Sequence, residues 1–461
     1  MQSIKINYHI GLFSLAMLIT GAIDSIRNLP STALFGSSLV FYFILAAITF
    51  LLPNALISAE LAGSKHGGGV YKWSAAAFGN GTGFFAIWLQ WINTMVWYPT
   101  ILSFIAGTAI YFIDPALAQN KLYLISVILL VFWGLTFLSL HGIKISAKFA
   151  SFCALVGMIA PMSFILISGI IWLCTGKTSQ VSLHVSAMLP SFKSFDSWSS
   201  LTAITSSFLG IELAAVHANH LREPGHDYPK ALLISVAIIL VTMIFGSLTI
   251  AIILPAGQIN LVNGVVQAFN NFLLVYHLQF LLPVIVVMII LGTTGSMISW
   301  VISPAKGLLQ AGQDGYLPAW MSKENKHGVA ANLLIIQAIL VSVVCLAFLL
   351  MPSVNGSYWL LTDLSTQLYV FMYVIMLVAG VKLKWQNNIG GTGFRIFGGR
   401  YGTLAVGVFG LIGCAIAIIV GFYPPANINV GSFWHYEMVF SAGIIVFILP
   451  ITFFYWYARK K

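Results

Sequence analysis

The chain has 461 residues, of which 59% are hydrophobic and only 7% are charged, whereas soluble domains carry about 25% charged residues. This balance excludes a soluble globular protein and predicts an integral membrane protein. The net charge of +10 does not indicate nucleic-acid binding, because the basic residues are scattered over short connections instead of clustering on one face.

Apolar stretches of about 20 residues, each long enough to cross a bilayer, recur along the chain. We predict twelve of them in one all-α membrane domain over residues 1–461, with little left over for a soluble domain. The predicted spans are 10–37, 38–62, 82–112, 121–141, 149–174, 198–219, 230–254, 278–304, 331–351, 358–381, 402–423 and 436–457. The first is too long and too interrupted for a cleavable signal peptide.

The first span contains a charged break. It reads Thr20-Gly-Ala-Ile-Asp24-Ser-Ile-Arg27-Asn-Leu-Pro30. An aspartate or an arginine at membrane depth costs roughly 2.5–3.5 kcal/mol on insertion scales unless it is paired or solvated. Gly21 and Pro30 frame the two charges, so the helix can unwind there. A helix broken around polar groups near the midplane is typical of the substrate sites of secondary transporters.

A second break is predicted in the span 198–219, because transporter repeats place broken helices at corresponding positions. Serines and threonines precede Gly210 and can satisfy freed backbone groups, and an intramembrane glutamate, Glu212, follows it. The two breaks predict one repeat over about 10–175, a second over about 198–385, and two additional helices over about 402–457.

The connections fit the same scheme. We expect a short helix at Val70–Phe78, an amphipathic segment at Ile259–Phe272 on the opposite side, and a connector at Lys306–Asn325. With the N-terminus inside the cell, 17 of the 21 basic residues fall in inner segments, so both termini are predicted to be cytoplasmic.

Motifs for enzyme chemistry are absent from the sequence. The four cysteines have no C-x-x-C spacing, and there is no zinc pattern, P-loop or nucleophile elbow. We therefore expect no metal, no cofactor, no ATP-driven pump and no enzyme activity within this chain.

The run Gly210-Ile-Glu-Leu-Ala-Ala-Val-His-Ala-Asn-His-Leu-Arg-Glu-Pro-Gly-His-Asp-Tyr-Pro-Lys-Ala231 resembles the sixth helix and following loop of APC-superfamily amino-acid transporters, which read E-x-x-N-P-x-x-x-x-P-x-A. The chain is similar, more specifically, to the bacterial glutamate/γ-aminobutyrate antiporter family. Further matching stretches begin at Ser58, Gly68, Ile298 and Leu317, so the resemblance covers nearly the whole chain. It implies a 5+5 inverted-repeat fold with two extra helices and exchange of amino acids by alternating access in a bacterial inner membrane.

The resemblance also implies functional positions. The glutamate after the second break matches Glu212, two tyrosines of the tenth helix match Tyr369 and Tyr373, and a tryptophan of the eighth helix matches Trp300. Three departures stand out. A family glutamate is Ser296 here, a family tyrosine in the first helix is replaced by Arg27, and the family's C-terminal plug is not expected because the chain ends soon after the last span.

These residues give a hypothesis for the substrate site. Amides after the first break would bind a substrate carboxylate, and carbonyls at Leu209 and Gly210 would accept from its ammonium. The expected donors are Ser25, Ile26, Arg27 and Asn28. Arg27 would bind a second carboxylate bidentately, which favours glutamate. The alternative is that Arg27 pairs with Asp24 or Glu212 and only holds the break together. For Asp24 a structural ion pair with Arg27 is favoured.

Other positions leave alternatives open. Glu212 is either a gating or proton-titrating group or is hydrogen-bonded to neighbouring backbone, and Tyr369 and Tyr373, on one helix face, either line the pocket or only pack. Asp363 is a candidate for substrate binding or gating. The histidines His217, His220 and His226 form either an acid sensor or a solvated loop.

Two alternative functions remain. A proton-coupled amino-acid symporter would share nearly all of these residues, and a non-transporting membrane sensor is more remote. The expected partners are small amino acids, with protons as a second candidate, and the lipid bilayer, without an obligate protein partner or nucleic acid.

Overall fold

The computed structural model describes residues 11–66, 69–111, 113–141, 152–153, 155–190, 196–215, 223–391 and 393–460. Every regular element within these ranges is helical, which confirms the predicted all-α fold. Nine helical segments in the described part are long and apolar enough to cross a membrane. The other three predicted spans correspond to helix α6, the pair α11–α12 and helix α15.

The first half of the chain contains α1 (Leu12–Ile23), η1 (Ile26–Asn28), α2 (Leu29–Ala33), η2 (Gly36–Ser38), α3 (Leu39–Ala46), η3 (Ala47–Leu51), α4 (Leu52–Ala62), α5 (Val70–Phe78), α6 (Asn80–Ile110), η4 (Pro115–Gln119), α7 (Lys121–Leu140), η5 (Leu155–Ile159), α9 (Ala160–Cys174) and α10 (Val185–Met188).

The second half contains η6 (Asp196–Ser199), α11 (Ser200–Ser207), α12 (Ile211–Ala215), α13 (Pro224–Ile253), η8 (Ala256–Gln258), α14 (Gly264–Val275), η9 (Gln279–Leu281), α15 (Leu282–Gln313), α16 (Ala331–Val344), α17 (Ala347–Leu350), α18 (Val354–Trp385), α19 (Gly399–Gly421), α20 (Phe433–Ile448) and α21 (Ile451–Arg459).

Both predicted breaks are present. In the first span, α1 ends at Ile23, Asp24 and Ser25 are extended, and the chain resumes its helical path in η1 and α2. In the sixth span, α11 and α12 are separated by a turn that ends at Gly210, whose φ is 98°. Because a positive φ strains any side chain with a Cβ, glycine is the residue that permits this turn.

The second span is distorted by a proline. The π-helical turn η3 lies directly before Pro53, which has no N–H to bond the carbonyl of Thr49 four residues earlier. Gly413 of α19 packs against this carbonyl, where an added Cβ would lie 2.2 Å from the Thr49 oxygen. A glycine at 413 therefore allows the backbones of spans two and eleven to approach closely.

Helix α13 is fastened to the first span by three hydroxyl groups. Ser235 Oγ donates to a carbonyl oxygen of α1 at 2.7 Å. Thr242 Oγ1 lies 2.8 Å from Asp24 Oδ2, and Ser247 Oγ lies 2.6 Å from Thr32 Oγ1. We call Ser235, Thr242 and Ser247 the hydroxyl seam. Because it follows the first span on both sides of the break, it joins spans one and seven into one unit.

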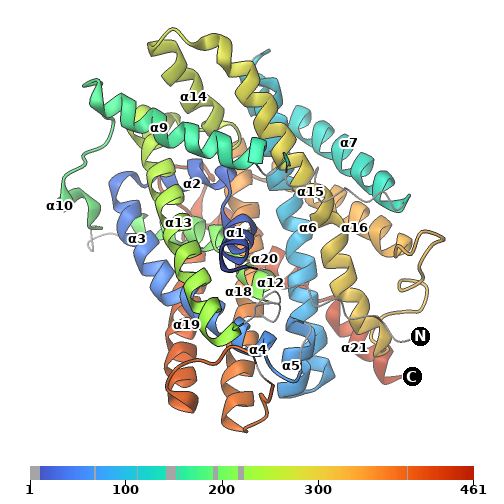
Figure 1. The fold of residues 1–461 in the computed structure, drawn as a ribbon. Coiled ribbons are helices and arrows are strands. Elements are labelled where there is room, and N and C mark those ends of the chain that lie inside the picture. Colours follow the sequence, from blue (N-terminus) through green and yellow to red (C-terminus); the bar gives the residue numbers. More distant parts are fainter. Residues whose placement is uncertain are drawn as a thin grey trace.

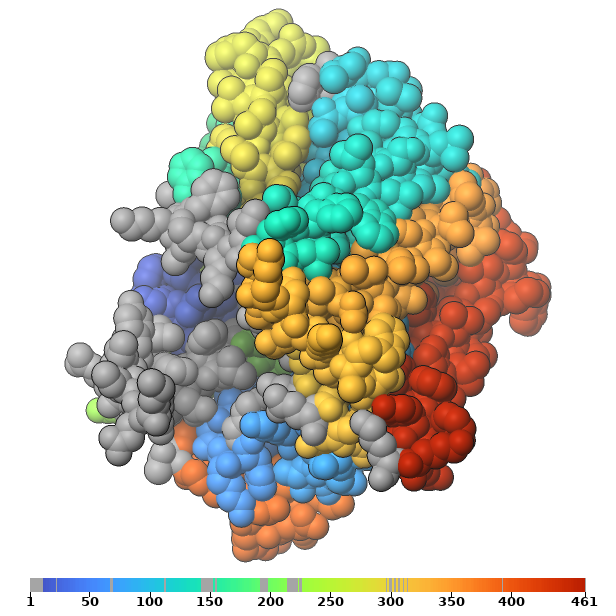
Figure 2. Space-filling model, turned by 90° about the vertical axis from the view of Figure 1, so that its right-hand side faces the viewer, coloured from blue at the N-terminus to red at the C-terminus, as the bar shows by residue number. Residues whose placement is uncertain are grey.

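The bundle has two distinct ends, which Figure 1 places at the bottom and the top and which we name after the short helices α5 and α14. The predicted helix at Val70–Phe78 has the bounds of α5, and α14 (Gly264–Val275) overlaps the predicted amphipathic segment at Ile259–Phe272 but begins and ends later. The connector predicted to begin at Lys306 begins later, because α15 continues to Gln313. Figure 2 shows the connection between α18 and α19 (orange) beside α5 (blue) at the lower end, and α20 and α21 (red) along the outer edge.

A buried ion pair lies at the α5 end. Glu60 of α4 is 1% exposed and pairs with Lys384 Nζ of α18. Its second oxygen accepts from Thr403 Oγ1 of α19 at 2.9 Å, and the Ile396 amide approaches the first oxygen at 3.4 Å. Spans two, ten and eleven are therefore joined by a carboxylate whose charge is fully compensated.

Candidate substrate site

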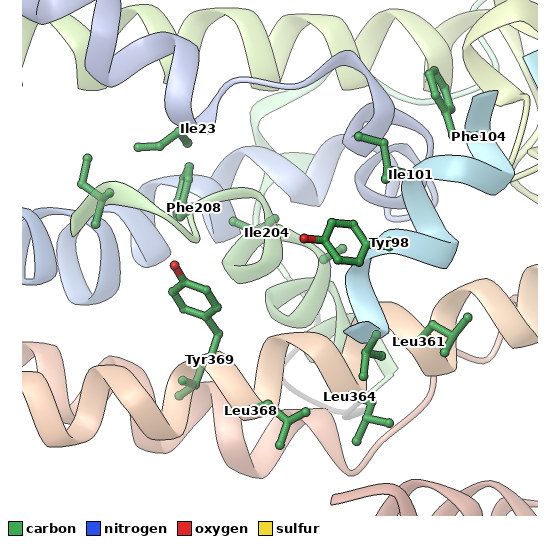
Figure 3. Packing of buried hydrophobic residues seen from close by; sticks show 14 of the residues in the cluster. Ile23, Tyr98, Ile101, Phe104, Ile204, Phe208, Leu361, Leu364, Leu368 and Tyr369 are labelled. Atoms are coloured by element: carbon green, nitrogen blue, oxygen red, sulfur yellow. The ribbon is translucent and has the colours of Figure 1, made fainter. Parts of the chain in front are cut away.

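The two breaks face the same two helices, α6 and α18. Figure 3 shows Ile23 and Phe208, which lie at the breaks of spans one and six, with the Tyr369 hydroxyl of α18 pointing toward them. All three side chains are buried. The charged residues that follow each break, Arg27 and Glu212, reach different levels of α6 and α18, as their contacts show.

Arg27 is a buried cation with spare hydrogen-bond donors. Its side chain is 4% exposed, and Nη1 donates to Thr100 Oγ1 at 2.8 Å and to the Tyr358 hydroxyl at 3.3 Å. The guanidinium lies 5.4 Å from the centre of the Trp97 ring, and Nε has no hydrogen-bond partner. Within the described part of the chain no carboxylate forms an ion pair with it. A planar, unpaired fork of this kind suits a bidentate anion.

The predicted ion pair between Asp24 and Arg27 is wrong, and Arg27 does not pair with Glu212 either. Side chains three residues apart would meet on a continuous helix. Asp24 and Ser25 are extended instead, with ψ angles of 124° and 119°, so the two charges diverge. Asp24 contacts Thr242 of α13, whereas Arg27 contacts α6 and α18.

Glu212 is held on both oxygens by side chains. Oε1 accepts from Gln90 Nε2 at 2.7 Å and from the Tyr369 hydroxyl at 2.5 Å, and Oε2 accepts from the Tyr373 hydroxyl at 2.5 Å. The Tyr373 oxygen in turn accepts from the Gly210 amide at 2.9 Å. The carboxylate is therefore hydrogen-bonded to side chains of α6 and α18, and both tyrosines of one helix face reach it.

The remaining residues of the predicted site lie at the breaks, but some of their backbone groups already form hydrogen bonds within the chain. Ile26 and Asn28 are buried in η1, and the Asn28 amide donates to the Ser25 carbonyl at 3.0 Å. The Gly210 carbonyl accepts from an amide of α12 at 3.1 Å, and Leu209 beside it is half-buried.

Trp300 and Asp363 are not brought to the breaks by any described contact. Trp300 lies in α15, but its side chain is outside the described part. Asp363 is fully buried on α18, where it accepts from the Tyr436 hydroxyl of α20 at 2.8 Å and from Gln367 Nε2 at 3.4 Å. It therefore joins the tenth and twelfth spans.

The predicted histidine cluster is only partly visible. His217 and His220 lie outside the described residues. His226 is exposed at the beginning of α13, and its Nδ1 lies 3.1 Å from an oxygen of Asp227. This placement fits a solvated histidine.

The sequence interpretation missed the partners of the charged residues. Gln90 could have been found, because an amide within an apolar span is unusual. The hydroxyls of Thr100, Tyr358 and Thr242 gave no such signal. Gln90 and Thr100 are ten residues apart on α6, which places the levels of Glu212 and Arg27 roughly 15 Å apart along that helix. The acidic group Glu212 and the basic group Arg27 therefore lie at separate levels of the bundle, one at each break.

Comparison with known proteins gives a consistent result. Residues 10–449 match the family model described as amino acid permease. An uncharacterized transporter of Legionella pneumophila is 39% identical over 453 residues, covering 98% of this chain and 97% of the relative. A glutamate/gamma-aminobutyrate antiporter of Lactococcus lactis is 28% identical, covering 96% of this chain and 89% of the relative. An arginine/ornithine antiporter of Pseudomonas aeruginosa is 26% identical, covering 71% and 67%.

Proposed function

Since the chain belongs to the amino acid permease family, we propose that it is an antiporter that exchanges amino acids, with a dicarboxylic amino acid such as glutamate as one substrate. Several relatives carry the name antiporter, which supports exchange over proton-coupled symport. The unpaired guanidinium of Arg27 supports the acidic substrate, because burying an arginine without a counter-charge is costly unless a ligand supplies that charge.

Arg27 carries the proposal. Its free Nε–H and its second terminal nitrogen can form two parallel hydrogen bonds to the side-chain carboxylate of the substrate. The remaining groups bind the amino-acid backbone, with donors after the first break for the α-carboxylate and carbonyls at the second break for the ammonium. The proposed site consists of Asp24, Ser25, Ile26, Arg27, Asn28, Leu209, Gly210, Glu212, Trp300, Tyr369 and Tyr373.

The same contacts support alternating access. The bonds of Glu212 to Gln90, Tyr369 and Tyr373 connect the second break with α6 and α18. Rocking of the unit that carries the breaks against these two helices breaks those bonds and opens one side of the site. A bacterial inner membrane, cytoplasmic termini and function without catalysis or an obligate protein partner belong to the same proposal.

The test is uptake of radiolabelled glutamate into proteoliposomes preloaded with glutamate, γ-aminobutyrate, a neutral amino acid, a basic amino acid or buffer. We expect uptake only into amino-acid-loaded vesicles. Equal uptake into buffer-loaded vesicles under an inward proton gradient would replace antiport by symport, and no glutamate uptake under any condition would exclude the acidic substrate.

Variants at position 27 test the role of the guanidinium. Arg27→Ala should raise the glutamate concentration for half-maximal exchange about 10- to 100-fold, while neutral substrates keep theirs, because a charged hydrogen bond contributes about 1.5–3 kcal/mol. Arg27→Lys keeps the charge but not the fork and should recover only part of the affinity. The matched control is Arg395→Ala, which removes an exposed arginine bonded to the Gly391 carbonyl. Equal losses for all substrates would contradict this role.

A further inference from the structure

Asp24 is a buried carboxyl group with too few partners for an ion. Its side chain is 5% exposed in the extended segment of the first break. Oδ1 has no hydrogen-bond partner, and among the described residues no cation forms an ion pair with it. Among the described residues, Thr242 and the neighbouring Ser25 amide are the groups that hydrogen-bond to this carboxyl. An ionised carboxylate at membrane depth with so little compensation is expensive, whereas a neutral carboxylic acid is not.

The hydroxyl of Thr242 permits the same state. Its Oγ1 lies 2.8 Å from Asp24 Oδ2 but also 2.9 Å from the Ile238 carbonyl oxygen. A hydroxyl has one hydrogen, and in a helix threonine commonly donates it to the carbonyl four residues earlier. When Thr242 donates to the Ile238 carbonyl, its lone pair faces Asp24, and the 2.8 Å contact is then a hydrogen bond donated by a protonated Oδ2. In that arrangement Asp24 donates to Thr242 and Thr242 donates to Ile238, whereas an ionised Asp24 would accept from Thr242.

No described charge near Asp24 offsets this. Helix α1 packs chiefly on α13 and α12. On α12, Glu212 is hydrogen-bonded to Gln90 and two tyrosines. Arg27, at the first break with Asp24, is directed away from Asp24 toward Thr100 of α6. The titratable side chains of α13 lie near its beginning, at least twelve residues or roughly 18 Å from Thr242, and are His226, Asp227, Tyr228 and Lys230. Lys144 and Lys148, which precede α9, lie outside the described residues.

We propose that Asp24 is a proton-binding site of the carrier and that its proton is exchanged with water when the first break opens to one side. The neutral form holds the break against α13 in the closed arrangement. It also removes a negative charge from the place where a substrate carboxylate binds, so a proton and an anionic substrate favour each other's binding. This coupling rests on the proposed function, but the proton site itself does not.

The proton site is tested first without substrate. Infrared difference spectra of the full chain in lipid, recorded between about pH 5 and about pH 8, should contain a carboxylic-acid carbonyl band that is lost in Asp24→Asn. Asparagine has the same shape and can donate to Thr242 as the neutral acid does. Asp227→Asn, which neutralises a more exposed acid at the α5 end, should keep the band. A band that remains in Asp24→Asn would overturn the proposal. A pH-dependent band that appears only when sodium ions are present would overturn it as well.

Transport then tests the coupling. In vesicles loaded with a pH-sensitive dye, glutamate exchange by the wild type should depend on pH, whereas exchange by Asp24→Asn should be flat within about twofold. Thr242→Val keeps the acid and provides a second variant if Asp24→Asn does not fold. It should shift the pH profile upward, because the ionised form loses the stronger hydrogen bond. A pH profile of exchange that is unchanged in either variant would overturn the coupling. If Asp24→Asn loses the infrared band but the wild type does not exchange glutamate, the proton site is supported and the proposed substrate is contradicted.

Discussion

Two buried carboxyl groups of the first two spans have opposite surroundings. Glu60, at the α5 end, has Lys384, Thr403 and a backbone amide as partners, whereas Asp24, at the first break, has one threonine and the amide of the next residue. The cations at the two places differ in the same way, since Lys384 has a carboxylate partner and Arg27 has none among the described residues. Compensated charges hold helices together, whereas in the site that we propose the uncompensated charges bind a solute.

The largest expected effect comes from breaking the compensated pair. Lys384→Met leaves Glu60 as an unpaired buried charge and should lower the free energy of unfolding by about 3–5 kcal/mol. Chemical or thermal unfolding in detergent measures this. Lys382→Met, on the same helix but over the Phe78 ring, should cost no more than about 1 kcal/mol. Similar stability of the two variants would contradict the structural role of the pair.

A smaller effect is expected at the second break, where Glu212 has intermediate compensation. Tyr373→Phe leaves both Oε2 and the Gly210 amide without a partner and should cost about 1–3 kcal/mol of stability. Tyr369→Phe should cost about 1 kcal/mol, because Gln90 still donates to Oε1. The reverse order in unfolding measurements would show that the two tyrosines do not share Glu212 as described.

At the first break, removing the charged side chain should not lower the free energy of unfolding. Arg27→Met removes an uncompensated buried charge and should leave the free energy of unfolding unchanged or raise it by about 1 kcal/mol, while the affinity for glutamate falls. The same unfolding assay, combined with substrate exchange, separates the two effects. Destabilisation as large as that of Lys384→Met would mean that Arg27 is a structural residue.

The smallest effect is expected at the exposed histidine. His226→Ala should change stability by less than about 0.5 kcal/mol and leave the pH profile of exchange unchanged, because its ionic partner among the described residues, Asp227, is partly exposed. A flattened pH profile in this variant would move the proton-sensitive group from the first break to the beginning of α13.

The architecture could be predicted because it depends on local sequence. Apolar length predicts the spans, and the glycine and the charges around each break predict where the helices unwind. The helix α5 at Val70–Phe78 follows from its flanking glycines and was found with its observed bounds. Each of these features is decided by neighbouring residues.

The pairing of charges could not be predicted in the same way. The expected Asp24–Arg27 pair assumed helical spacing at the one place where the helix is interrupted. The observed partners, among them Thr100, Tyr358 and Thr242, come from other spans and are common residue types in apolar helices. Sequence distance carries no information about such contacts, so the charged residues were recognised while their surroundings were not.

The hydroxyl seam has a mechanical consequence. Three contacts distributed on both sides of the first break prevent α13 from sliding along the first span without losing several buried hydrogen bonds together. A pair of spin labels on α1 and α13 should therefore report one constant distance throughout the cycle. A pair on α1 and α6 should report two distances. The α1–α13 pair is therefore the constant reference against which the motion can be measured.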